Sequence, residues 1–265
     1  MLCKIYRQWQ RSREARIRRL QRLPLPQWQA AKAKLPLLDQ LAPLERVHLR
    51  QLTSAFVQEK VFSGANGLKI NSSMRTCIAA QACLLILHMN QGLRPFRGWT
   101  EVIVYPDTFR VRHETLDEAG VLHISEEELA GESWDRGPII LSWGDIATDE
   151  PDADLNGAII LHEFAHKLDA LSGTATGMPP LRRDMDRAEW TRVFTAAFEK
   201  LGAEVNAGRN TAIDPYAAES PPEFFAVATE YYFEYPETLK AAYPEVYKQL
   251  ERYYLGATFA SDPAS

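Results

Sequence analysis

Apolar residues follow two different periods along the chain. They recur at helical spacing over residues 41–56 and again over residues 78–89, where Gly92 ends the pattern. From Trp99 onward, short β-branched and aromatic runs separated by turn residues predict strands; these runs are 101–105, 109–112, 121–124 and 138–143. Helical spacing returns after Asn156. Strands followed by helices predict an α+β fold, a small mixed sheet packed with helices and preceded by a helical N-terminal region.

The segment His162-Glu163-Phe164-Ala165-His166 lies within the returning helical pattern. Residues i and i+4 share one face of a helix, so His162 and His166 could bind one zinc ion. Glu163 could then accept a proton from a metal-bound water. Apolar residues cover most of this helix, which we expect to end near Ser172 and Gly173.

A helix that is apolar nearly all round is buried, and buried imidazoles and carboxylates are costly without partners. A metal ion would satisfy His162, Glu163 and His166 together. The alternative is a pair of core histidines bonded to backbone carbonyls, with Glu163 in an ion pair with Lys167 or an arginine. We prefer the metal site because the chain also offers a third ligand.

A hydrolytic zinc site usually has three protein ligands and an open fourth position. Ser220 is a good N-cap and Pro221 suits a first helical position, so a second helix should begin there and run toward Pro236. Glu223 lies in its first turn beside an apolar stripe and is our third ligand. A first-turn carboxylate that only complements the helix dipole is the alternative. Glu219 is the competing carboxylate.

Two further acidic residues could orient the ligand histidines. Glu230, seven residues after Glu223, returns to nearly the same helix face, and Asp169 follows His166 by three residues. Either could accept a hydrogen bond from a ligand imidazole. Either could equally form an ordinary salt bridge on its helix, and both interpretations stay open at this point.

These motifs resemble the Mlc titration factor A family of bacterial zinc-dependent peptidases, over about residues 36–255. The segments that carry the resemblance are Asn71-Ser72-Ser73-Met74-Arg75, Ile103-Val104-Tyr105-Pro106, Gly137-Pro138-Ile139-Ile140-Leu141-Ser142-Trp143, His162-Glu163-Phe164-Ala165-His166-Lys167-Leu168-Asp169, Asp214-Pro215-Tyr216-Ala217-Ala218 and Pro222-Glu223-Phe224-Phe225-Ala226-Val227. The resemblance implies a zincin-like metalloprotease core, similar to the catalytic domain of anthrax lethal factor. It also implies aminopeptidase-like activity and binding of the glucose-responsive repressor Mlc.

The resemblance also implies roles for single residues. His162, His166 and Glu223 match the zinc ligands of the family, Glu163 matches its general base, and Tyr216 matches a tyrosine beside the metal. A phenol at that place could donate a hydrogen bond to the oxyanion that develops during amide hydrolysis. Packing is the alternative for Tyr216, in a chain with ten tyrosines. The expected substrate is a peptide or protein, and residues 121–124 could offer a strand edge for it.

Composition agrees with a cytoplasmic enzyme. The chain has 265 residues, 46% of them hydrophobic, and three cysteines, a sparse use that fits a reducing compartment. No run of eighteen apolar residues predicts a membrane span.

Residues 1–22 hold eight Lys and Arg residues against one Glu. We interpret this leader as a solvated basic helix, with contacts to nucleic acid, an anionic membrane or a partner as alternatives. We do not expect nucleic acid as a partner. The predicted organisation is a basic leader and Pro-containing linker over 1–35, a helical subdomain over 36–95, a catalytic core over 96–255 and a tail over 256–265.

Overall fold

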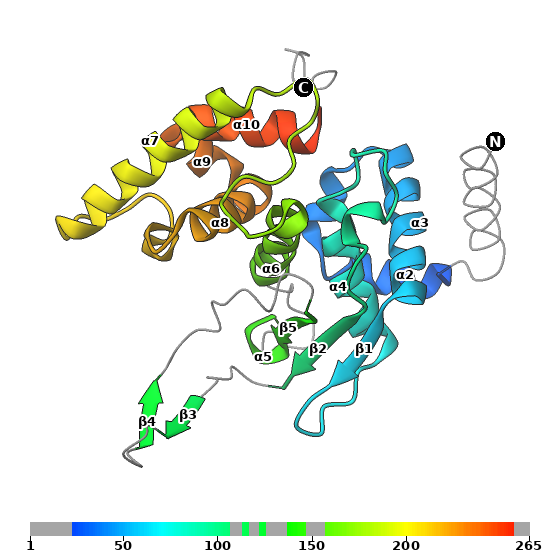
Figure 1. The fold of residues 1–265 in the computed structure, drawn as a ribbon. Coiled ribbons are helices and arrows are strands. Elements are labelled where there is room, and N and C mark those ends of the chain that lie inside the picture. The colour runs from blue at the N-terminus through cyan, green and yellow to red at the C-terminus, as the bar shows by residue number, and fades with distance from the viewer. Residues whose placement is uncertain (1–22, 107–112, 117–121, 126–136, 147–156, 257–265) are drawn as a thin grey trace, which may run out of the picture.

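The computed structural model describes residues 23–106, 113–116, 122–125, 137–146 and 157–256 (Figure 1). The basic leader, the strand predicted over 109–112 and residues 257–265 of the tail lie outside the described residues. The described part is dominated by helices.

Two of the first helices overlap the ranges that the apolar spacing marked, α3 (Pro43–Glu59) and α4 (Ser72–Leu84). The helix α2 (Leu25–Lys32) and the 3-10 helices η1 (Pro36–Gln40) and η2 (Arg94–Phe96) lie outside those ranges. Asn71 caps α4, because its side chain accepts a hydrogen bond from the backbone N–H of Met74 at 2.9 Å.

The segment we expected to be a Pro-containing linker contains α2 instead. Pro26 lies in the first turn of this helix, where a missing N–H costs nothing, so the prolines mark its beginning rather than a break. Trp28 and Ala31 of α2 are buried, and α2 packs against α4. Leu23 is tied to α3 through its N–H, which donates to Ser54 Oγ at 3.1 Å.

The sheet has three parallel strands in the order β1–β2–β5: β1 (Val61–Gly64), β2 (Glu101–Tyr105) and β5 (Ile139–Ser142). A separate antiparallel pair, β3 (His113–Leu116) and β4 (Leu122–Ser125), pairs Thr115 with His123. We expected one mixed sheet, and the described strands form a parallel sheet and a hairpin. The connection between β1 and β2 runs through the helix α4, and such a crossover lets the two strands pair in parallel. The four-residue strand β1 is not among the strands that the sequence predicted. The strand edge expected over 121–124 therefore pairs with β3, and Val121 lies outside the described residues.

The regular elements of the described residues after β5 are helices. They are α5 (Trp143–Ile146), α6 (Ala158–Asp169), the 3-10 helix η3 (Ala170–Ser172), α7 (Arg187–Asn206), the 3-10 helix η4 (Pro215–Ala218), α8 (Pro221–Glu234), α9 (Pro236–Ala242) and α10 (Pro244–Tyr254). Figure 1 shows α6 between the sheet and α4 on one side and the group α7–α10 on the other. Because α6 contacts α4, β5 and α8, it joins the two parts of the molecule.

Phe164 anchors α6 in an aromatic cluster. Its ring centroid lies 5.7 Å from that of Phe56, 5.2 Å from that of Phe96 and 5.8 Å from that of Trp99. Phe164 is fully buried, and such edge and tilted contacts add to the free energy of burial. The cluster fixes which face of α6 turns away from the sheet.

Among the described residues, none of the helices is both long enough and apolar enough to cross a membrane.

Candidate metal centre

Two helices supply the side chains of the site. His162 and His166 lie one turn apart on α6, and Glu223 lies in the first turn of α8. The helix start that we predicted at Ser220 is observed: Ser220 Oγ accepts a hydrogen bond from the N–H of Glu223 at 3.3 Å, and Pro221 is the first residue of α8. This local geometry places the Glu223 carboxylate over α6.

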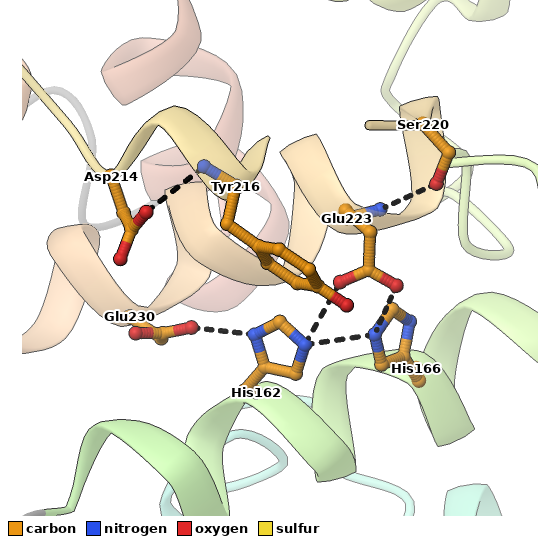
Figure 2. Close-up of polar contacts among 7 residues, drawn as sticks. All are labelled: His162, His166, Asp214, Tyr216, Ser220, Glu223 and Glu230. Carbon is orange, nitrogen blue, oxygen red and sulfur yellow. Dashed lines mark hydrogen bonds and ion pairs between the residues drawn. The ribbon is translucent and has the colours of Figure 1, made fainter. Parts of the chain in front are cut away.

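Three ligand-type groups converge between α6 and α8 (Figure 2). His162 Nε2 lies 3.0 Å from His166 Nε2 and 3.0 Å from Glu223 Oε2. His166 Nε2 lies 3.3 Å from Glu223 Oε1. Each of the three side chains is partly buried.

The donor set fits a metal ion. Nitrogen and oxygen ligands of tetrahedral zinc, about 2.0–2.1 Å from the ion, lie about 3.3 Å from one another, close to the separations found here. Two neutral imidazoles cannot both present lone pairs to each other at 3.0 Å without a cation or proton between them. Glu223 Oε2 is also buried without a well-directed hydrogen bond, although it lies 3.0 Å from His162 Nε2. A cation between these atoms would satisfy all of them.

The same proximity shifts the ionisation of the metal-free site. Burial lowers the pKa of His162, but the adjacent carboxylates of Glu223 and Glu230 outweigh burial and raise this pKa to about 10. Burial raises the pKa of Glu223, and the adjacent imidazoles of His162 and His166 outweigh that effect and lower it to about 2. Without a metal, the site is therefore held by a charged histidine between carboxylates.

Glu230 is the partner of the other nitrogen of His162. Its Oε1 lies 2.5 Å from His162 Nδ1, which leaves Nε2 directed at Glu223 and His166 (Figure 2). Glu230 could have accepted a hydrogen bond from a ligand imidazole or formed an ordinary salt bridge on its helix, and in the structure it contacts the imidazole. The seven-residue spacing from Glu223 explains it, since two turns of α8 bring both carboxylates to the face that meets α6.

Glu163 and Tyr216 lie beside the three converging groups. Burial raises the pKa of the Glu163 carboxyl, while the charges of His162 and His166 oppose the rise. The ring centroid of Tyr216, in η4, lies 6.2 Å from that of His162, and its phenol points toward the imidazole and Glu223 in Figure 2. Asp214 caps the start of η4, because its Oδ1 accepts a hydrogen bond from the N–H of Tyr216 at 2.9 Å.

The remaining acidic candidates lie elsewhere. Glu219, the competing third ligand, is exposed at the end of η4. Asp169 is fully buried, and its Oδ2 accepts the backbone N–H of Gly177 at 2.6 Å. No sequence signal predicted this contact, because it depends on the path of the loop after α6.

Several relatives are similar over nearly their whole length. A protein of Synechocystis sp. is 38% identical over 251 residues, which cover 94% of this chain and 90% of the relative. Mlc titration factor A of Pectobacterium atrosepticum is 37% identical over 236 residues, 87% of this chain and 86% of the relative. The protein of the same name from Serratia proteamaculans is 37% identical over 234 residues, 87% of each chain.

The model of the family described as glucose-regulated metallo-peptidase M90 matches residues 6–255. The match therefore begins within the basic leader, not near residue 36 as we expected. The resemblance to the Mlc titration factor A family is confirmed. On this evidence, the chain belongs to the M90 family of metallo-peptidases.

Proposed function

We propose that this protein is a zinc-dependent, aminopeptidase-like peptidase with a zincin-type core. The convergence of His162 Nε2, His166 Nε2 and a Glu223 carboxylate oxygen from two helices carries the proposal. Two imidazoles and one carboxylate are a donor set that hydrolytic zinc sites use. Membership of a metallo-peptidase family supports it.

A zinc ion held by these three residues would supply positive charge that polarises a peptide carbonyl and acidifies water at neutral pH. Glu163 then accepts the proton of the attacking water and delivers it to the leaving amine. A carboxyl whose pKa is raised by burial is suited to both steps, because it accepts a proton from water more readily than an ordinary glutamate does and can still deliver that proton to the more basic leaving amine. Tyr216 donates a hydrogen bond to the developing oxyanion.

Glu230 prepares the site without touching substrate. By accepting from His162 Nδ1 it fixes the tautomer in which Nε2 is free to bind the metal. The proposed substrate is a peptide or protein. The free cysteines Cys77 and Cys83, both buried, support a reducing cytoplasm as the place of action.

Metal content and one substitution test this function. Purified wild-type protein should hold about one zinc per chain by inductively coupled plasma mass spectrometry. Glu163→Gln should keep the zinc and lose activity on short peptides by about a hundred- to ten-thousandfold. Glu219→Gln, at an exposed glutamate of the neighbouring η4 turn, is the matched control and should retain activity. A fully active, zinc-loaded Glu163→Gln protein would rule out our general base.

The ligands have their own test. Ala in place of His162, His166 or Glu223 should each weaken zinc binding strongly, while Glu219→Ala should not. Loss of zinc in Glu219→Ala with full retention in Glu223→Ala would make Glu219 the third ligand.

A second candidate function follows from the names of the relatives. Several are called Mlc titration factor A, which favours a regulatory protein that sequesters an Mlc-like repressor, with peptidase activity secondary. Glu163→Gln separates the two functions, because it should stop hydrolysis and leave repressor binding intact. Repressor binding by the inactive variant, measured by titration calorimetry, would support the second function; its absence in both proteins would refute it.

A further inference from the structure

Asp169 ends α6 with a carboxylate that has no exposure to solvent. Burial raises its pKa, and the backbone amides of Gly177, Thr176 and Met178, together with the charge of His166, oppose the rise. The shortest contact is the 2.6 Å hydrogen bond from the Gly177 N–H to Oδ2. The cost of burying this carboxylate is therefore offset mainly by the loop that follows α6.

Gly177 is held from its other side as well. Its carbonyl oxygen accepts a hydrogen bond from Trp190 Nε1 of α7 at 3.1 Å. Trp190 is itself buried and stacks on Phe194, with ring centroids 4.1 Å apart. The peptide groups on both sides of the Gly177 α-carbon thus have fixed partners in α6 and α7.

The α-carbon of Gly177 lies against the beginning of α8. A Cβ added there would lie 2.5 Å from the carbonyl oxygen of Pro221 and 2.8 Å from its carbonyl carbon, closer than real Cβ atoms approach. The backbone of Gly177 also has a φ of +77°, which favours glycine. Pro221 is the first residue of α8, and Glu223 follows it by two residues.

We propose that Asp169 is a positioning residue that holds Glu223 opposite His162 and His166 by fixing the backbone of Gly177 against Pro221. The proposal rests on the metal site proposed above, because Glu223 matters here as a ligand. Its physical basis is that the proposed ligands come from two different helices, α6 and α8. The distance between them must be set by something other than the metal if the site is to bind tightly.

A matched pair of glycine variants tests the contact with α8. Gly177→Ala introduces both the clash with Pro221 and the strain of a positive φ. Gly67→Ala introduces the same strain, at φ +81°, where a Cβ would meet nothing within 4 Å. We expect zinc affinity, measured by competition with a chelator, to fall about ten- to a hundredfold in Gly177→Ala and to stay at the wild-type value in Gly67→Ala. Equal affinities in the two variants would overturn the proposal.

Substitutions of Asp169 test the hydrogen bond. The amide oxygen of Asp169→Asn can still accept the N–H of Gly177, whereas Asp169→Ala leaves that N–H without its acceptor. We expect zinc affinity to fall in the order wild type, Asn, Ala, and the absorption bands of the cobalt-loaded Ala variant to differ from those of wild type. A folded Asp169→Ala protein with wild-type affinity and bands would contradict the proposal. If Asp169→Ala is insoluble, the glycine pair decides.

Hydrogen exchange of the metal-free protein separates this inference from the proposed function. The amides of residues 223–226 should exchange faster in Gly177→Ala than in Gly67→Ala, because the first turn of α8 loses its support. Wild-type protein that binds no zinc would refute the proposed function and leave this readout unaffected. Unchanged protection of residues 223–226 in Gly177→Ala would refute the inference even if zinc binds.

Discussion

The two faces of α6 are satisfied in opposite ways. Toward the sheet, Phe164 packs among the rings of Phe56, Phe96 and Trp99. A cation, Lys60, borders this cluster, with its Nζ 3.6 Å from the ring centroid of Trp99. Toward α8, His162 lies between Glu223 and Glu230 at hydrogen-bonding distance. The packing of the first face depends on burial of apolar area, and the contacts of the second face depend on the charge states of its histidine and glutamate side chains.

This difference separates stability from function along one helix. Apolar packing changes little with pH or metal, so it can hold α6 in place in every state of the protein. The polar face responds to protons and cations, because its pKa values are shifted by the groups that would bind the metal. Substitutions on the two faces should therefore give different signatures.

The largest effect is expected on the apolar face. Phe164→Ala should lower the free energy of unfolding by about 3–5 kcal/mol, because it leaves a cavity in a fully buried aromatic cluster. Urea denaturation of the metal-free protein measures this. Phe198→Ala, at a partly buried aromatic residue of α7, is the control and should cost clearly less. A loss of less than 1 kcal/mol in Phe164→Ala would contradict the stabilising role of this face.

Tyr216→Phe should leave stability and zinc content intact and lower kcat by about ten- to a thousandfold, since it removes one hydrogen bond made in the transition state. Steady-state kinetics on a chromogenic peptide measure the change. Tyr235→Phe is the control, because Tyr235 is exposed and lies at the far end of α8. An unchanged kcat in zinc-loaded Tyr216→Phe protein would return Tyr216 to a packing role.

The polar face should also show a pH dependence that ordinary histidines lack. Because the pKa of His162 is raised to about 10, a proton competes with zinc throughout the neutral range, and zinc affinity should rise about tenfold per pH unit between pH 7 and 9. Glu223, with a pKa of about 2, contributes no slope there. Chelator competition at several pH values measures the slope. A flat profile above pH 7 would mean that His162 is already neutral.

The same shift predicts how the metal-free protein responds to pH. A histidine whose pKa rises from 6.5 to about 10 on folding stabilises the fold fully below pH 6.5 and loses that contribution as the pH rises toward 10. Glu230→Gln removes one of the groups that raise this pKa and should reduce the loss. Thermal unfolding of both proteins across this pH range tests the expectation.

The smallest effect is expected from the leader. A chain that begins at Leu23 should fold, bind zinc and cleave peptides like the full chain, because the described packing begins with Leu23 against α3. A chain that begins at Leu35 should be less stable, since it lacks the buried Trp28 of α2. Activity assays and thermal unfolding of both truncations decide this. Loss of activity in a folded, zinc-loaded chain beginning at Leu23 would give the leader a part in the site.

Short-range patterns in the sequence predicted much of the candidate site. The i and i+4 spacing of His162 and His166, and the Ser220 cap before Glu223, are local signals that the structure reproduces as α6 and the start of α8. The prolines near residue 25 are compatible both with the expected linker and with the first turn of a helix, and the structure has the helix. Strand β1 was missed because four residues carry too weak a pattern.

The sequence by itself determined the two helices of the site, α6 and α8, and the face of each that carries the ligand-type side chains. Only the tertiary structure decided how those faces meet: Glu230 contacts His162, while Asp169 turns to Gly177. Both are acidic residues at helical spacing from a ligand-type residue, so periodicity could not distinguish them. The path of the loop after α6, which contacts Pro221, sets the partner of Asp169, because a buried carboxylate accepts hydrogen bonds from whichever donors the folded chain brings to it.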